Sequence, residues 1–294
     1  MNKNNKDYKS LYRKYKKKYL IAKHNNLLGG AKLLYQDESD FQKIHLYQEN
    51  NNIWLTLNDQ IQFHSKEYKI SHYLQCNVPL KKFKPKKILI LGGGDGIAAS
   101  FVLKHPFVES VTLVEIDKNM IKMIKTSEQM RKITNNVAYN EKLNIIIGDG
   151  IQFVFNCEEK YDLIIDDIEY DFTNQPKEFS EFQYMKKLLR LTNILSFSEP
   201  ESDILGEKVD YRKEFPTFYN IYMDIIKSKE LKFEPYIGNK YNIFKEMDYS
   251  ESFLKELEND DFLEKFNMDI SGYNYGYDGN TNFGFEMYVI LHKL

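Results

Sequence analysis

A strand that runs directly into a glycine-rich turn and then into a helix constrains this chain more than any other feature. Residues 88–91 read Ile-Leu-Ile-Leu, residues 92–96 read Gly-Gly-Gly-Asp-Gly, and a helical stretch follows over 97–104. Glycines at such a junction permit positive φ and let a ligand approach the backbone, while the helix N-terminus offers unpaired N–H groups. Turns of this kind also occur for purely structural reasons, so the surrounding sequence has to decide between the two uses.

The surrounding pattern predicts an α/β fold. Apolar runs at 88–91, 111–114, 143–147, 163–165 and 194–197 are separated by amphipathic helical stretches. Runs this apolar suit strands covered on both faces, so we predict a doubly wound, mostly parallel sheet. Alternating runs within 31–80, such as 43–47 and 53–57, predict a small antiparallel β unit before it. We expect 205–270 to be mostly helical and 284–292 to form a strand that returns to the sheet.

Carboxylates follow two of the predicted strands. Glu115 ends the second strand, 20 residues after Asp95, and Asp149 lies between Gly148 and Gly150 after the third. A carboxylate at the first position can accept hydrogen bonds from both ribose hydroxyls, and one at the second can accept from an adenine amino group. Asp149 also fits a helix N-cap. The combination predicts a nucleoside site in a methyltransferase-like domain, although a dinucleotide-dependent oxidoreductase remains open on this geometry.

Asp95 bears on which nucleoside binds. S-adenosylmethionine carries a carboxylate that would lie near the glycine-rich turn, whereas its decarboxylated form ends there in an ammonium group. An aspartate repels the first and attracts the second. Asp95 therefore favours the decarboxylated molecule, with a capping role for the following helix as the structural alternative.

Several segments together resemble the spermidine synthases and related polyamine aminopropyltransferases. The similarity covers about 170 residues and is carried by residues 90–96, 103–106, 111–117 and 148–150, extending back through 41–42, 58–62 and 77–80 and forward through 161–167 and 182–195. It implies a transferase that moves an aminopropyl group from decarboxylated S-adenosylmethionine to a small amine in polyamine biosynthesis. It also implies a homodimer and no metal.

The resemblance assigns roles to individual residues. Strand alternation lets only one of Asp166 and Asp167 face the pocket, and the resemblance implies that Asp167 is that residue and the catalytic base. The implied cofactor-binding set is Gln42, Gly92, Gly93, Gly94, Asp95, Gly96, Glu115, Ile116, Asp149 and Gly150, and the implied substrate-binding set is Gln62, His72, Glu169 and Asp171.

The chain departs from the family around the amine. The family's Asp-Ser-Ser-Asp-Pro reads here as Asp167-Ile168-Glu169-Tyr170-Asp171, and its Tyr-His-Glu reads Ser71-His72-Tyr73. Two other functions therefore stay open. One is a methyltransferase that uses intact S-adenosylmethionine, and the other is a non-catalytic binding protein that retains the fold.

We divide the chain into a basic tail (1–30), a small β domain (31–80) and a nucleoside-binding domain with C-terminal helices and strand (81–294). The tail, in which the spacing of apolar residues suggests a basic amphipathic helix, has a net charge of +8 in a chain whose net charge is −2. A solvated appendage is one interpretation, and contact with an acidic partner such as a nucleic acid, an acidic surface or a membrane is the other. The absence of a long apolar run or secretory signal predicts a cytoplasmic protein without a membrane span. Two cysteines and six scattered histidines predict neither a disulfide framework nor a metal site.

Overall fold

The computed structural model describes residues 31–65, 68–168, 179–199, 234–235, 255, 266–275 and 284–293. The basic tail 1–30 and the predicted amine-binding residues Glu169 and Asp171 lie outside the described residues, as does most of 205–270.

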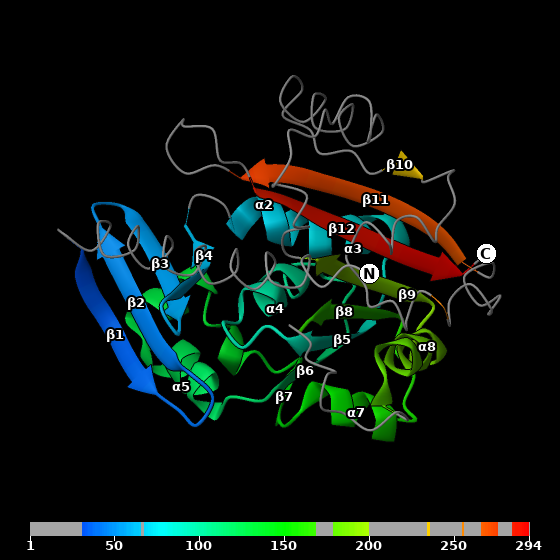
Figure 1. The fold of residues 1–294 in the computed structure, drawn as a ribbon, viewed down its shortest axis with the longest axis horizontal. Helices are drawn as coiled ribbons and strands as arrows, with labels where there is room; N and C mark the ends of the chain where they lie inside the picture. Colours follow the sequence, from blue (N-terminus) through cyan, green and yellow to red (C-terminus); the bar gives the residue numbers. More distant parts are fainter. Residues whose placement is uncertain are drawn as a thin grey trace, which may run out of the picture.

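An eight-stranded sheet forms the centre of the molecule, with the strand order β10-β11-β12-β9-β8-β5-β6-β7 (Figure 1). Its parallel part consists of β5 (Lys87–Gly92), β6 (Ser110–Glu115), β7 (Leu143–Ile147), β8 (Leu163–Asp167) and β9 (Ile194–Glu199). Antiparallel pairing adds β12 (Gly284–Lys293), β11 (Phe266–Tyr275) and the two-residue β10 (Glu234–Pro235) beyond β9. The predicted doubly wound, mostly parallel α/β sheet and its returning final strand are confirmed.

Apolar side chains cover both faces of this sheet, as the strand sequences predict. On β5, Ile88 and Ile90 join one buried cluster, and Leu89 and Leu91 join another. The first cluster includes residues of α4 (Ile97–Val102), α5 (Lys118–Thr126), α6 (Glu128–Ile133) and the short 3₁₀ helix η3 (Val137–Tyr139). The second includes residues of α7 (Gly150–Asn156) and α8 (Glu181–Leu191).

The smaller sheet is antiparallel and contains β1 (Lys32–Glu38), β2 (Lys43–Glu49), β3 (Asn52–Leu57) and β4 (Gln60–His64). Ile44, Leu46, Leu55 and Phe63 on its inner face belong to the same buried cluster as Ile88 and Ile90. The predicted small β unit therefore exists and packs on the core of the larger sheet.

Helices occupy the end of the range that we assigned to the β unit. After β4 the chain forms α2 (Tyr68–His72), a π-helical turn η2 (Tyr73–Asn77) and α3 (Val78–Phe83). Leu74, Cys76 and Leu80 are fully buried, but their spacings of two and four residues also fit a strand, so the sequence pattern alone does not reveal these helices. This segment contacts the carboxyl edge of the sheet, where the Gln75 side chain donates hydrogen bonds to the last two residues of β8.

The C-terminal range also differs from the expectation. Residues 266–270, which we expected to lie in a mostly helical stretch, begin the long strand β11. Phe266, Met268 and Ile270 alternate with polar residues, and ten paired residues join this strand to β12. Period-two alternation of this kind matches a strand, and long-range pairing with β12 supplies the partner that local sequence could not reveal.

Candidate active site

The carboxyl edge of the parallel strands brings the predicted site residues together. Gly92 at the end of β5 lies opposite Asp167 on β8, and Glu115 at the end of β6 lies opposite Ile147 on β7. The backbone N–H of Gly148 donates to the carbonyl of Glu115 at 2.9 Å, which holds the ends of β6 and β7 at one level. Ligands of open α/β sheets bind at this edge.

The glycine-rich turn is shaped for close approach at two positions. Gly92 has φ of +77°, and a Cβ there would lie 2.4 Å from the carbonyl oxygen of Asp167. A Cβ on Gly94 would lie 2.4 Å from Oε2 of Glu115. Side chains at these positions would therefore displace the two acids that the sequence assigns to chemistry and to the ribose.

Glu115 lies against the turn and is 8% exposed. Burial raises the pKa of its carboxyl, and the backbone N–H groups of Asp117 and Gly94 act in the opposite direction by hydrogen bonding to the charged form. The bond from the Asp117 N–H to Oε1 measures 2.8 Å. These hydrogen bonds hold the Glu115 side chain at the strand end.

The side chains of Asp166 and Asp167 lie on opposite faces of β8. Asp166 is buried, and its Oδ1 accepts a 3.4 Å hydrogen bond from the hydroxyl of Tyr184, a buried residue of α8. Asp167 is exposed, its Oδ1 accepts from Nε2 of Gln75 at 3.1 Å, and its Oδ2 lies 3.7 Å from the position of a Cβ on Gly93. Of the two acids, Asp167 is the one that faces the glycine-rich turn.

Asp95 and His72 form an electrostatic pair beside this turn. Burial raises the pKa of the Asp95 carboxyl and lowers the pKa of the His72 imidazole, and their mutual attraction opposes both shifts. Asp95 also accepts a 2.8 Å hydrogen bond from the N–H of Ile97, the first residue of α4, although Gly96 is the N-cap residue of that helix. A cationic ligand group beside Asp95 would favour its charged form.

Gln42 reaches the edge of the large sheet through Asp117. Its Nε2 donates to Oδ2 of Asp117 at 2.9 Å, and the Ser39 hydroxyl donates to the same oxygen at 2.7 Å. Asp117 is fully buried and its Oδ1 also caps α5 through the Asn119 N–H. This residue joins the small sheet to the site and was missed by sequence reasoning, although an aspartate before a helical run is a usual capping signal.

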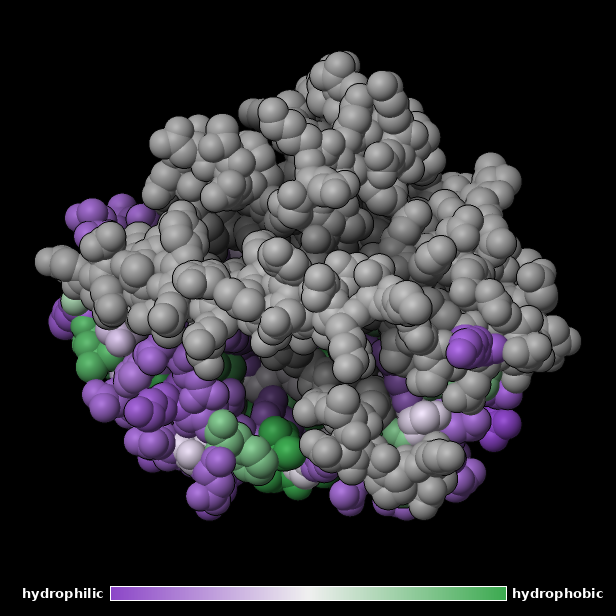
Figure 2. All heavy atoms as spheres, viewed as in Figure 1, coloured by the Kyte–Doolittle hydropathy of each residue, from purple (hydrophilic) through white to green (hydrophobic). Residues whose placement is uncertain are grey.

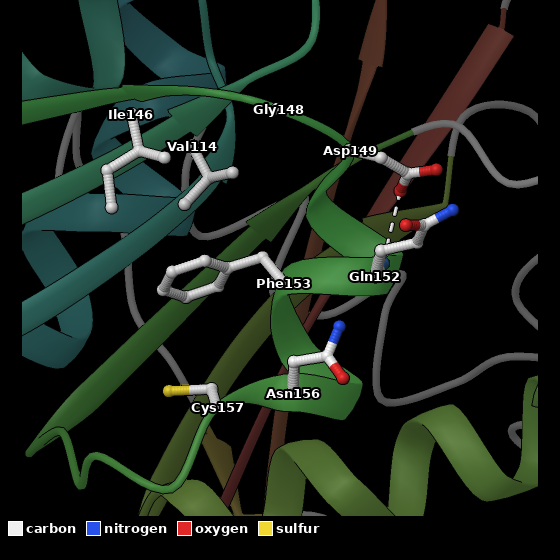
Figure 3. Close-up of a pocket in the computed structure, with 8 residues that line it drawn as sticks. All are labelled: Val114, Ile146, Gly148, Asp149, Gln152, Phe153, Asn156 and Cys157. Carbon is white, nitrogen blue, oxygen red and sulfur yellow. Dashed lines mark hydrogen bonds between the residues drawn. The ribbon is translucent and has the colours of Figure 1, made fainter.

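Asp149 caps α7, and a cavity of about 320 Å³ opens beside it. Its Oδ1 accepts from the N–H groups of Ile151 and Gln152 at 2.8 and 3.2 Å. In Figure 3 the ring of Phe153 points toward Val114 and Ile146, which form an apolar wall, while Gln152 lies near Asp149. The residues lining the cavity include neither Glu115 nor Asp167, so it adjoins the candidate site rather than containing its chemistry.

The remaining predicted residues differ in how closely they approach the site. Ile116 is 42% exposed beside Glu115 at the carboxyl edge and is one of five large apolar side chains that are exposed in the described part of the chain. On the face that Figure 2 shows, the coloured surface is mainly hydrophilic, with smaller hydrophobic patches. Gly150 is buried, with Ile168 and Leu91 packed around it. Gln62 is exposed on β4, and within the described ranges no hydrogen bond joins it to the site.

The described part of the chain contains no group of three or more His, Cys, Asp or Glu side chains that could hold a metal ion. No described helix has both the length and the apolar character needed to cross a membrane.

Comparison with known families gives a domain match. Residues 63–208 match the spermine/spermidine synthase domain. The polyamine aminopropyltransferase of Methanocaldococcus jannaschii is 34% identical over 163 residues, which cover 55% of this chain and 54% of that protein. Polyamine aminopropyltransferase 2 of Bacillus cereus is 35% identical over 156 residues, covering 53% of this chain and 41% of the relative. The chain therefore spans about half or less of these relatives.

Solved structures support the fold. A spermidine synthase in complex with the transition state analogue AdoDATO superposes with a TM-score of 0.58 at 18% identity, covering 89% of this chain and 74% of that one. Spermidine synthase from Thermotoga maritima gives a TM-score of 0.56 at 20% identity, covering 89% and 73%.

Proposed function

Because residues 63–208 match the spermine/spermidine synthase domain, we propose that this chain transfers an aminopropyl group from decarboxylated S-adenosylmethionine to a small amine. The observation that carries the proposal is the position of two carboxylates around one turn. Glu115 lies against Gly94, and Asp167 faces Gly93.

The side chains around the turn fit the proposed co-substrate. Glu115 accepts hydrogen bonds from the ribose hydroxyls, and the exposed apolar side chain of Ile116 contacts the adenine ring. Asp149 accepts from the adenine amino group, with one carboxylate oxygen already used as the cap of α7. Asp95 pairs with the terminal ammonium group, and this positive charge favours the charged form of a carboxyl whose pKa is raised by burial.

The reaction requires that the two substrates be correctly oriented and that one base accept a proton. The co-substrate supplies an electrophilic carbon next to a sulfonium. The amine nitrogen forms a bond to that carbon as the carbon–sulfur bond breaks, and the electron pair of that bond stays on sulfur, which becomes a neutral thioether. Asp167 takes the proton that the amine nitrogen must lose and later releases it to solvent. The leaving group needs no acid, so orientation by the turn and its acids supplies the remaining catalysis.

Product analysis tests this function directly. We expect incubation with decarboxylated S-adenosylmethionine and a panel of amines to yield methylthioadenosine and an aminopropylated amine, both identified by mass spectrometry. A methylated product from intact S-adenosylmethionine would instead indicate a methyltransferase. No product with either nucleoside, together with a thermal shift on binding, would indicate a non-catalytic protein.

Replacing Glu115 with Gln is expected to weaken nucleoside binding by about 1–3 kcal/mol, because a charged acceptor is lost. Calorimetric titration with methylthioadenosine measures this change. Unaltered affinity in a folded variant would remove Glu115 from the site.

The thermal stability of Glu115→Gln shows whether weaker binding results from a loss of folding. Burial raises the pKa of Glu115 in the folded protein, so the wild type loses stability as the pH rises from the unfolded to the folded pKa. The amide that replaces this carboxyl in Glu115→Gln carries no charge at any of these pH values. We therefore expect the ligand-free variant to be at least as thermally stable as the wild type above neutral pH, which separates lost binding from lost folding.

The homodimer, the cytoplasmic location, the division into domains at 30 and 80 and the acidic partner of the basic tail remain proposals. We also propose that Gln62, His72, Glu169 and Asp171 line the amine side of the site. His72 has the best support, through its attraction to Asp95.

A further inference from the structure

A buried glutamine contacts the proposed catalytic acid. Gln75, in the π-helical turn η2, is 2% exposed, and its Nε2 donates to Oδ1 of Asp167 at 3.1 Å and to the backbone carbonyl of Asp166 at 3.3 Å. A buried amide needs such partners, because an unsatisfied donor in the interior costs free energy. Both partners belong to the last two residues of β8.

The backbone of Gln75 is fixed as firmly as its side chain. Its carbonyl accepts a 2.7 Å hydrogen bond from the hydroxyl of Ser196, which is fully buried on β9. Ser196 lies beside Ile165 in the parallel pairing of β8 with β9. A chain of hydrogen bonds thus runs from the buried Ser196 on β9 through the buried Gln75 to the exposed Asp167 on β8.

This connection distinguishes the two oxygens of Asp167. Oδ1 accepts from Gln75, whereas Oδ2 lies on the side of Gly93 in the glycine-rich turn. A carboxylate held by one oxygen loses rotational freedom at the other, which is the condition for aligning a base with a reacting amine.

We propose that Gln75 is a positioning residue for catalysis, which fixes Asp167 so that Oδ2 is presented to the amine. The inference rests on the proposed function for the reaction itself, but the contact between Gln75 and Asp167 can be measured without turnover. Sequence reasoning did not find this residue because a single glutamine in a mainly apolar helical stretch has no distinguishing pattern.

Other titratable groups lie near Asp167, so the variants used in any test must leave these residues unchanged. Asp95 on the glycine-rich turn and His72 on α2 form the pair described above. The Cys76 thiol, also on η2, has its pKa raised by burial and by the charges of Asp167 and Asp95. Asp166 and Tyr184 lie on the other face of β8.

The test compares wild type with Gln75→Met, which keeps an unbranched side chain of similar length and removes both donated hydrogen bonds. The primary measurement is the titration of the Asp167 carboxyl by NMR in protein labelled with ¹³C at aspartate carboxyls, with Asp167→Asn assigning the signal. Because a donated hydrogen bond favours the charged form, we expect the midpoint to rise by about one pH unit in Gln75→Met. An unchanged midpoint would overturn the proposal.

Kinetics provide the second measurement. We expect kcat to fall about 10- to 100-fold, with the acidic limb of the pH–rate profile moved upward and nucleoside affinity within about twofold of wild type. Equal kcat in an active enzyme would also overturn a positioning role. The wild type could prove inactive with every amine. A shifted Asp167 midpoint in Gln75→Met would then confirm the hydrogen bond between Gln75 and Asp167, while the inactivity would reject a role for this bond in aminopropyl transfer.

Two further variants separate this role from general loss of packing. Thr56→Val removes a hydroxyl from another fully buried position, on β3, and should leave both the midpoint and kcat unchanged. Gln75→Asn keeps the amide but shortens its reach, and should reproduce the change in the midpoint if Gln75→Met does not fold. A wild-type midpoint in Gln75→Asn would contradict the proposal.

Discussion

Asp167→Asn is expected to lower turnover by at least about 100-fold while nucleoside affinity remains close to that of the wild type. Asn keeps the size of the side chain and can still accept from Gln75 through its oxygen, but it cannot take a proton from the amine. Steady-state kinetics together with calorimetric nucleoside binding measure the two effects separately. Raising the pH should recover part of the lost rate, because more of the amine is then neutral in solution.

The neighbouring acid supplies a matched control. Asp166 is buried against Tyr184 on the other face of β8, so Asp166→Asn should affect thermal stability more than turnover. If Asp166→Asn abolished turnover and Asp167→Asn did not, the base would be Asp166 and our reading of β8 would be wrong. If neither variant changed turnover in an active enzyme, the proton acceptor would lie elsewhere.

The centre of the fold was predictable because each of its elements has a recognisable pattern in the local sequence. The strand at β5 is a run of β-branched and leucine residues, the turn after it contains four glycines in five positions, and α4 begins directly afterwards. Each of these features follows from the steric properties of single residues. The parallel arrangement of the strands then follows from their alternation with helices.

The parts that were not predicted depend on long-range partners. Residues 68–83 carry an apolar spacing that is compatible with several structures, and the helical outcome comes from packing over the sheet edge. Within β11, Asp269 is 2% exposed and pairs with Lys82 of α3. A buried aspartate in a strand is anticipated by no local rule, since its partner lies far away in the sequence.

The same division applies to the site. Glu115 lies at a strand end, where topology alone brings it to the carboxyl edge, so its residue type and position were sufficient to nominate it. Topology brings both Asp166 and Asp167 to the same edge, and the family resemblance was needed to choose Asp167. Gln75 reaches the site from η2, and Asp117 links it to the small sheet through Gln42. Such contacts between separate elements leave no periodicity in the sequence, and only a structure can identify them.

Gly92→Ala is expected to cost about 2–5 kcal/mol of folding free energy and to lower turnover as well. Part of the cost is conformational, because an alanine at φ of +77° adopts a left-handed backbone at about 1–2 kcal/mol. The remainder is steric, since the new Cβ would lie 2.4 Å from the carbonyl oxygen of Asp167, a backbone atom that cannot move alone. Any relaxation must displace the end of β8 and the carboxylate that it carries.

Gly148→Ala provides the contrast for this prediction because both changes add one methyl group at the carboxyl edge. A Cβ on Gly148 would meet no atom within 4 Å, and its backbone is outside the left-handed region. Its free energy of unfolding should therefore stay within about 1 kcal/mol of wild type, with the smaller entropy of the unfolded chain acting in favour of the folded state. Chemical denaturation of the two variants measures the difference. Equal stabilities would mean that β5 and β8 approach less closely at Gly92 than the structure shows, and the fixed position of Asp167 would lose its main steric support.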